Sequence, residues 1–203
     1  MEKQRFYKFY GFHGTAESCA NNILETKEFE LGEPREDHWL GQGAYFFKDD
    51  EEQAVQWAIS KVTNSSDYKG ETPYVIEVIL EAIEENVLNL DSRKGLNYLD
   101  SHIKKLRSEG IVIEYNENDE KSSAKVRCFL LSLVSDEIWM IQRSFPVKSI
   151  FDKKELFSQM QLNLIGAQVC VRNKNVINGN SINGKEIKLY KRNKRKEPRR
   201  LSV

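Results

Sequence analysis

The chain has 203 residues, of which 39% are hydrophobic and 31% charged, and its 31 basic and 31 acidic residues give a formal net charge of zero. That length supports one sizeable hydrophobic core, so a single compact domain is expected. No apolar run approaches the roughly 18 residues of a membrane helix, and the N-terminus lacks the apolar segment of a secretory signal, so we expect a cytoplasmic protein without membrane contact.

An aromatic stretch begins the predicted structure. Residues 6–12, FYKFYGF, favour a strand that ends in a turn at Gly14 and Thr15, and Thr15 is a candidate N-cap for a helix. Residues 16–24 then repeat apolar side chains every three to four positions, which is the spacing of one helix face. The sequence therefore predicts a strand followed at once by a helix.

Two glycines precede the second predicted strand. Gly41 and Gly43 bracket a tight entry into residues 44–47, which are small and aromatic. Asp49 or Asp50 can then cap the next helix, because each is a good N-cap residue with a Glu or Gln three positions later.

The remaining pattern mixes both kinds of element. Strands are predicted over 72–80, 138–145, 167–173 and 185–192, and helices within 96–106 and 126–133. Helices and strands that cluster in this way indicate the α+β class, with a mostly antiparallel sheet.

The zero net charge conceals a basic C-terminal segment. Residues 185–200 hold nine Lys or Arg against two Glu, a local charge of +7, so the rest of the chain sums to −7. Such a run is typical of contact with nucleic-acid phosphates and equally of a solvated terminus. We predict a domain over residues 1–190 and a basic tail over residues 191–203.

Common nucleotide-binding and catalytic motifs are absent. The sequence contains no G-x-G-x-x-G before a helix, no P-loop, no H-E-x-x-H and no G-x-S-x-G. Cys19, Cys128 and Cys170 are odd in number and lack C-x-x-C spacing, which argues against a zinc site and a disulfide framework. No metal is therefore expected.

Two short stretches could instead bind a dinucleotide. Tyr45 offers a flat ring for stacking, His13 can bond sugar hydroxyls, and Gly14 lets a ligand approach the main chain. Each has an ordinary alternative, since a histidine can simply end a strand and aromatic rings can fill a core. His38 is either an exposed loop residue or a ligand contact.

These residues resemble the ADP-ribosyltransferase superfamily, in its His-Tyr-Glu branch that includes the diphtheria toxin and poly(ADP-ribose) polymerase groups. The family pattern is HG[ST] on a first strand, G-x-G-x-Y-F before a helix, and a third catalytic position on a late strand. HGTAESCANNIL, WLGQGAYFFKDDEEQAVQWA and AQVCVRNKNVI match it, over about residues 9–58 and again near 165–177. The resemblance implies two packed, mostly antiparallel sheets that form an NAD cleft flanked by helices.

The resemblance also assigns roles to individual residues. It implies that His13 holds the adenosine ribose of NAD, that the main chain of Gly14 holds the nicotinamide amide, and that Thr15 supports the nicotinamide ribose. Tyr45 would stack on the nicotinamide ring, and Gly43 belongs to the same cofactor-binding group. NAD is then a substrate, and no metal takes part.

The third catalytic position departs from the family. If AQVCVRN aligns with the late strand, Gln168 stands where the family has a glutamate. A glutamine can bond a ribose hydroxyl, but it carries no negative charge and cannot act as a general base. A single transfer is therefore expected rather than polymer synthesis, and the structural alternative for Gln168 is a buried amide.

The resemblance predicts an NAD-dependent mono-ADP-ribosyltransferase with His13, Tyr45 and Gln168 as catalytic residues. A bacterial toxin or anti-phage effector that modifies RNA, DNA or protein fits this format, and a toxin would need an inhibitor such as an antitoxin protein. The alternatives are a module that binds NAD or ADP-ribose without turnover, attached to nucleic acid by its tail, and a domain that serves only as an interaction partner.

Overall fold

The computed structural model describes residues 4–31, 38–112, 120–146 and 165–188. The predicted tail over residues 191–203 lies outside these ranges, as does the end of the strand predicted over 185–192.

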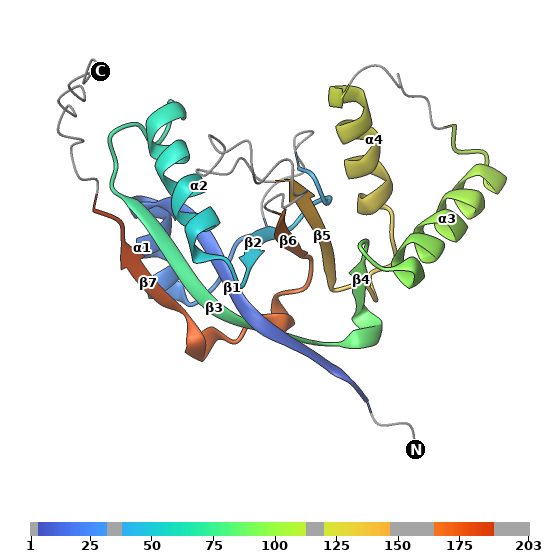
Figure 1. Cartoon of the computed structure of the whole chain (residues 1–203), viewed down its shortest axis with the longest axis horizontal. Coiled ribbons are helices and arrows are strands. Elements are labelled where there is room, and N and C mark those ends of the chain that lie inside the picture. Colours follow the sequence, from blue (N-terminus) through green and yellow to red (C-terminus); the bar gives the residue numbers. More distant parts are fainter. Residues whose placement is uncertain (1–3, 32–37, 113–119, 147–164, 189–203) are drawn as a thin grey trace, which may run out of the picture.

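The centre of the protein is a seven-stranded sheet with the strand order β4-β5-β6-β2-β1-β3-β7 (Figure 1). The strands are β1 Phe6–Ala16, β2 Ala44–Lys48, β3 Pro73–Ile83, β4 Val87–Asn89, β5 Met140–Pro146, β6 Ile165–Val171 and β7 Asn183–Glu186. Every neighbouring pair is antiparallel except β4 and β5, which are parallel. The predictions of an α+β fold and a mostly antiparallel sheet are therefore confirmed.

Helices follow β1, β2 and β4, and one precedes β5. They are α1 Glu17–Thr26, α2 Glu51–Asn64, α3 Arg93–Ser108 and α4 Glu120–Ser132, with short 3-10 turns at Glu84–Asn86, Lys174–Val176 and Gly179–Ser181. None of the helices in the described ranges is long and apolar enough to cross a bilayer.

A short pairing between β1 and β2, here called the seam, joins β1, β3 and β7 to the other four strands of the sheet. β1 pairs with β3 along its full length from Phe6 to Ala16, but with β2 only where Gly11 meets Lys48 and Phe12 meets Phe47. The expected two sheets are thus a single sheet in the structure, since this short pairing is enough to join them. Beyond Phe12 the two strands no longer pair.

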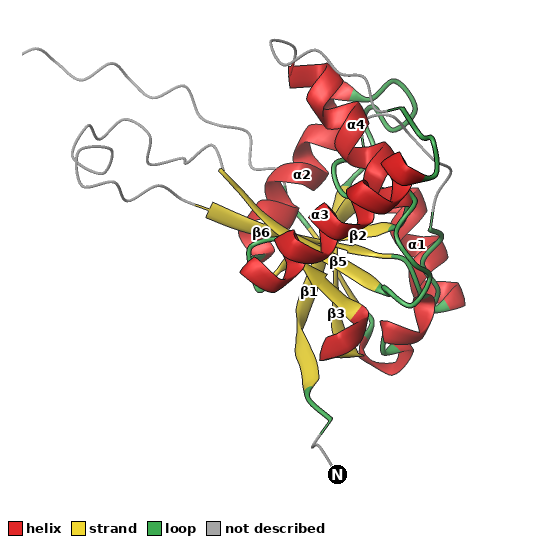
Figure 2. Cartoon of the chain, turned by 90° about the vertical axis from the view of Figure 1, so that its right-hand side faces the viewer, coloured by secondary structure: helices red, strands yellow, loops and turns green. Residues whose placement is uncertain are grey.

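Each face of the sheet has its own hydrophobic core. One cluster combines the inner face of α1, including Ile23, with Phe46, Ile76 and Val169 from the sheet. The other combines Leu40 and Leu131 with residues of β4, β5 and β6 on the opposite face. α2 also covers this second face of the sheet (Figure 2). Its residue Ala54 lies directly over Gly14 of β1.

The two predicted caps have different outcomes. Asp50 caps α2, where its carboxylate accepts a hydrogen bond from the Gln53 N–H at 3.1 Å. Thr15 does not cap α1, since β1 continues to Ala16 and no side chain bonds the start of the helix. Pairing with β3 along the whole of β1 holds Thr15 in the strand, and this outweighs its local preference for a cap.

Candidate functional site

His13 bridges the two strands of the seam. Its Nδ1 donates a hydrogen bond to the main-chain oxygen of Tyr45 at 2.8 Å. The ring meets Phe29 and Phe46, with centroid distances of 5.5 and 5.8 Å. Burial lowers the pKa of the imidazole from 6.5 to about 4, an effect that the Tyr45 bond opposes and Lys61 reinforces. His13 is therefore neutral at physiological pH.

This shift makes the stability of the protein depend on pH. A base whose folded pKa is depressed favours the folded state above its unfolded pKa, and this contribution is lost as the pH falls. Between pH 6.5 and pH 4 we expect the free energy of unfolding to fall by up to about 3 kcal/mol through His13 alone. Urea titrations across this range should show a smaller decrease for His13→Asn, which retains a donor and does not titrate. Equal pH dependence in both proteins would contradict the assignment.

The imidazole stands where strand pairing would otherwise continue. Tyr10 accepts a hydrogen bond from Asp49 N at 2.8 Å, so its main chain faces β2, and alternation along β1 turns the main chain of Gly14 the same way. Continued pairing would join Gly14 to Tyr45, but the ladder ends at Phe12 and the Tyr45 carbonyl bonds His13 instead. Within the described residues, the N–H and C=O of Gly14 thus face the seam without a ladder partner. This donor and acceptor pair matches a primary carboxamide.

The Thr15 side chain contacts α2. Its hydroxyl is fully buried and accepts a hydrogen bond from Lys61 Nζ at 3.1 Å. The same ammonium group lies 3.9 Å from the Cys19 sulfur and 4.4 Å from the centre of the Tyr68 ring. Thr15 therefore helps to anchor α2 on β1, in addition to the ligand role that the resemblance implies.

Tyr45 closes the glycine-containing loop onto itself. Its hydroxyl donates to the Gly41 oxygen at 2.6 Å and accepts from Leu40 N at 2.9 Å. Burial is the largest cause that raises the pKa of this hydroxyl. Gly41 has a positive φ of 85°, and a Cβ on Gly43 would meet the Val171 oxygen at 2.3 Å. Both glycines are therefore required by the loop that fixes the phenol ring.

Tyr45→Phe tests whether the hydroxyl is structural. The substitution keeps the ring but leaves a donor at Leu40 and an acceptor at Gly41 unpaired, which should cost about 1–3 kcal/mol of folding free energy. Denaturant titration measures this loss, and ligand affinity at the ring should be retained once the protein is folded. A variant as stable as the wild type would show that the two bonds contribute nothing.

The rings of His13 and Tyr45 do not face each other. Phe12 pairs with Phe47, so these two side chains share one face of the sheet. Tyr45 lies two residues from Phe47 and belongs to that face, whereas His13 follows Phe12 and belongs to the other. The resemblance implies that His13 and Tyr45 both bind one NAD molecule in a single cleft. That shared arrangement of the two rings is wrong, since they lie on opposite faces and only the main chain of Tyr45 meets the imidazole.

Gln168 lies on the same face as Tyr45. It pairs with Phe47 on one side and with Arg143 on the other, and Tyr45 pairs with Cys170 two residues along β6. The Gln168 amide is partly exposed and forms no hydrogen bond with the described residues. It is therefore available to a ligand rather than buried with protein partners.

An open groove of about 230 Å³ lies over this face. Phe47 and Gln168 line it from the sheet, and two exposed indoles, Trp39 and Trp57, line it with exposed fractions of 46% and 58%. Gln53, Gln56 and Ser60 of α2 complete its polar lining. An aromatic surface with several amides that bond none of the described residues suits a planar, polar ligand.

The sequence alone predicts Trp57 as a packing residue on the inner face of its helix and Gln53 only as part of a helix cap, and it assigns no role to Gln56. A signal for them exists, because Gln53, Gln56, Trp57 and Ser60 follow the spacing of a single helix stripe. This stripe runs beside the small residues Ala54 and Ala58 that pack on β1.

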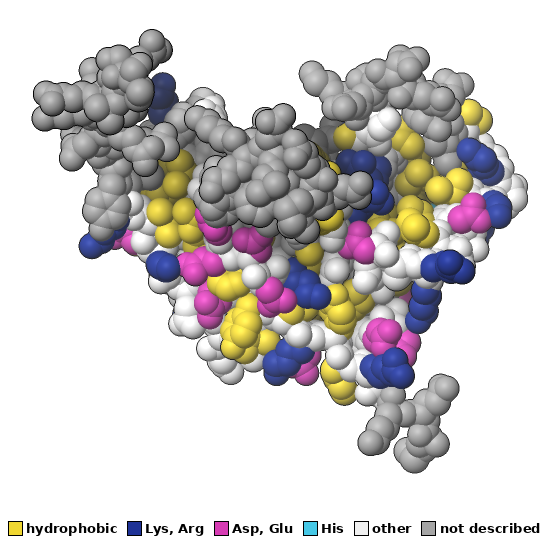
Figure 3. Space-filling view, in the orientation of Figure 1, with side chains coloured by type: hydrophobic (Ala, Val, Ile, Leu, Met, Phe, Trp, Pro, Cys, Tyr) yellow, Lys and Arg dark blue, Asp and Glu magenta, His cyan; other side chains and the backbone are white. Residues whose placement is uncertain are grey.

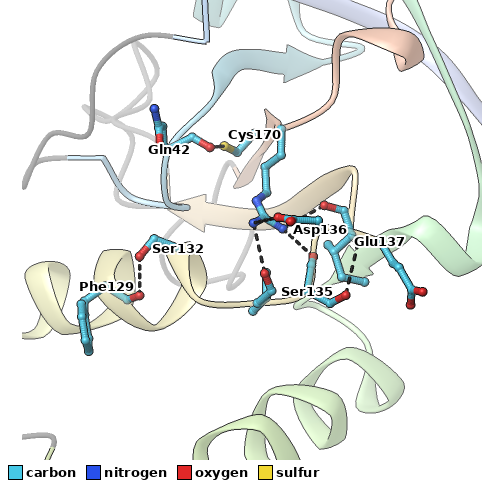
Figure 4. A network of polar contacts seen from close by, with 10 residues as sticks. Gln42, Phe129, Ser132, Ser135, Asp136, Glu137 and Cys170 are labelled. Atoms are coloured by element: carbon cyan, nitrogen blue, oxygen red, sulfur yellow. Dashed lines mark hydrogen bonds and ion pairs between the residues drawn. The ribbon is translucent and has the colours of Figure 1, made fainter. Parts of the chain in front are cut away.

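A second cavity, of about 500 Å³, lies beyond the C-terminal end of β6 near Arg172. Three main-chain oxygens of the α4–β5 connection, those of Val134, Ser135 and Ile138, accept hydrogen bonds from the Arg172 guanidinium at 2.9 to 3.1 Å. Figure 4 shows this connection with Ser135 and Asp136 below Cys170. Arg172 is thus committed to holding α4 against the sheet. The described residues contain no group of three or more potential metal ligands here or elsewhere.

Comparisons with known proteins leave the family open. No family model and no solved structure matches the chain. Over 117 residues it is 33% identical to the uncharacterized protein MJ0359 of Methanocaldococcus jannaschii, a match that covers 51% of this chain and 54% of that protein. The chain thus matches about half the length of this relative.

Proposed function

We propose that the protein is an NAD-dependent mono-ADP-ribosyltransferase. The observation that carries this proposal is the interrupted ladder, because the main chain of Gly14 presents a donor and an acceptor at the seam next to the aromatic groove. Nicotinamide is a planar ring with a carboxamide, and the two features together suit it.

In this proposal His13 is a positioning residue. By bonding the Tyr45 carbonyl it keeps β2 from closing on Gly14, and its neutral state adds no positive charge beside a cationic centre. The nicotinamide carboxamide bonds Gly14, and the exposed ring of Trp57 lines the space for the heterocycle. Stacking on Tyr45 remains the role that the resemblance implies.

The reaction breaks the bond between the ribose C1′ and the nicotinamide nitrogen. The electron pair leaves with neutral nicotinamide, and C1′ becomes oxocarbenium-like. The nucleophilic atom of the acceptor then forms a bond to C1′ and loses its proton to solvent. Gln168 can orient the ribose through a hydroxyl. The acceptor in this proposal is a nucleic acid or protein of the cytoplasm. The enzyme itself acts as a toxin or in defence against phage.

Incubation with NAD labelled in its adenylate half tests the proposal. Separate pools of protein, RNA and DNA should reveal label on one pool, with release of an equal amount of nicotinamide. Label on no pool and no nicotinamide release would exclude transfer.

Trp57→Ala should raise the KM for NAD about tenfold, because base or pyridine stacking on an aromatic ring contributes roughly 1–3 kcal/mol. Tyr98→Ala is the matched control, since Tyr98 is an exposed aromatic residue on α3 and lies outside the groove. Steady-state nicotinamide release measures both variants. Equal KM changes in the two variants would show that NAD does not bind in the groove.

The neutral amide of Gln168 favours a second candidate, a module that binds NAD without turnover. None of the described residues that line the groove is a carboxylate that could stabilise a cation. Calorimetry with recovery of intact NAD after tight binding would support this candidate over the enzyme.

A further inference from the structure

Two arginines meet at the edge of the groove that Trp39 and Phe145 line. Arg127 of α4 donates from Nε to the Trp39 oxygen at 2.9 Å, and its guanidinium carbon lies 6.0 and 5.9 Å from the ring centres of Trp39 and Phe145. Trp39 and Phe145 are themselves in edge contact at 4.8 Å. The Arg127 side chain is therefore fixed over the aromatic end of the groove.

Arg143 of β5 approaches the same place from the sheet. It lies two residues before Phe145 and so shares its face, and it pairs directly with Gln168 of the groove. Its guanidinium forms no hydrogen bond or ion pair with the described residues. The two cations are close enough that Arg143, after burial, lowers the pKa of Arg127.

No carboxylate of the described residues bonds either guanidinium. Asp91 contacts this part of β5, but its carboxylate accepts hydrogen bonds from the Ser144 N–H at 2.9 Å and hydroxyl at 2.8 Å. Lys and Arg side chains gather next to α4 on this face of the molecule (Figure 3). Two adjacent like charges repel each other, and an anion bound between them would relieve that cost.

We propose that Arg127 and Arg143 form a subsite for the pyrophosphate of a nucleotide bound in the groove. Guanidinium groups donate in a planar fork that fits phosphoryl oxygens, and a pyrophosphate has enough oxygens to bond both arginines at once. The neighbouring Trp39 provides a ring on which an attached base can stack. Only the identity of the nucleotide, NAD, rests on the proposed function, and the anion subsite itself does not.

Calorimetric titration with inorganic pyrophosphate tests the subsite directly. Arg143→Gln removes one charge without removing any hydrogen bond to the described residues and should weaken pyrophosphate binding about tenfold or more. Arg107→Gln, an exposed arginine on α3, is the matched control and should change affinity less than about twofold. Unchanged affinity in Arg143→Gln, or an equal loss in Arg107→Gln, would overturn the subsite.

Arg127→Gln should produce a similar loss, and its melting temperature shows whether loss of the Trp39 bond has disturbed the fold. If it has, Arg143→Gln alone decides the outcome.

Further titrations identify the source of the phosphate. ADP-ribose should lose affinity in Arg143→Gln as pyrophosphate does, whereas adenosine, which has no phosphate, should bind both proteins equally. If Arg143→Gln weakens the binding of a single-stranded oligonucleotide but not of ADP-ribose, the two arginines bind a nucleic-acid backbone. That result would overturn the assignment to a nucleotide. If the protein does not turn over NAD but still binds pyrophosphate in a way that depends on Arg143, the proposed function is wrong and the anion subsite stands.

Discussion

Gly14→Ala is expected to destabilise the protein by about 3 kcal/mol or more, because a methyl group has no room at this position. A Cβ on Gly14 would lie 2.0 Å from the Ala54 oxygen and 2.9 Å from the Ala58 nitrogen. Both are main-chain atoms of α2, so they cannot move aside as the end of a side chain can. The helix would have to lift from β1, and its buried Ala54 and Ala58 would lose contact.

Denaturant titration measures the effect of Gly14→Ala, and Gly179→Ala is its control. A Cβ on Gly179 would find its nearest atom, the Lys27 oxygen, at 3.6 Å, which is an ordinary contact. A Gly14→Ala protein as stable as the control would show that α2 does not rest on the strand as described. The close contact also means that a glycine before Thr15 has a structural explanation independent of any ligand.

Gln168→Glu is expected to increase nicotinamide release about tenfold or more, since a carboxylate placed beside a developing cation stabilises the transition state. The new side chain has the same length as glutamine and would lie next to Arg143, which pairs with this position. That guanidinium would keep the carboxyl ionised at neutral pH by lowering its pKa. The substitution therefore supplies the charge that this site lacks relative to the family it resembles.

Gln168→Leu is the control of similar size without hydrogen-bonding capacity, and it should release nicotinamide more slowly than the wild type. Single-turnover measurements at saturating NAD separate this effect from changes in binding. A Gln168→Glu protein no faster than the wild type would contradict a catalytic role for this strand position. It would also strengthen the alternative of a module that binds NAD intact.

Local patterns predicted most elements of the fold but not how the strands align. The periodicity of residues 16–24 and the cap at Asp50 each produced the expected helix. The relation between His13 and Tyr45 depends instead on the register of β1 against β2. With Phe12 opposite Phe47 the two side chains point to opposite faces, and a shift of one residue would have brought them together. That register is set by tertiary packing across a long connection, which the local sequence does not encode.

The groove could not be predicted from the sequence for a related reason. Trp57 has the sequence surroundings of a core residue, and only the position of α2 on Gly14 turns its ring toward Phe47 and Gln168. Arg127 and Arg143 are separated along the chain and meet only because α4 lies against β5 near Phe145. Sites of this kind depend on tertiary contacts and have no local motif.

The seam has a consequence for biosynthesis. β1, β3 and β7 lie on one side of it and β2, β4, β5 and β6 on the other, so no single cut in the chain yields either half. β3 pairs with β1 early in the chain but with β7 only near its described C-terminal end. A ribosome-bound chain would therefore carry an open β3 edge until residues 183–186 have been synthesised, and such an edge can pair with a neighbouring nascent chain.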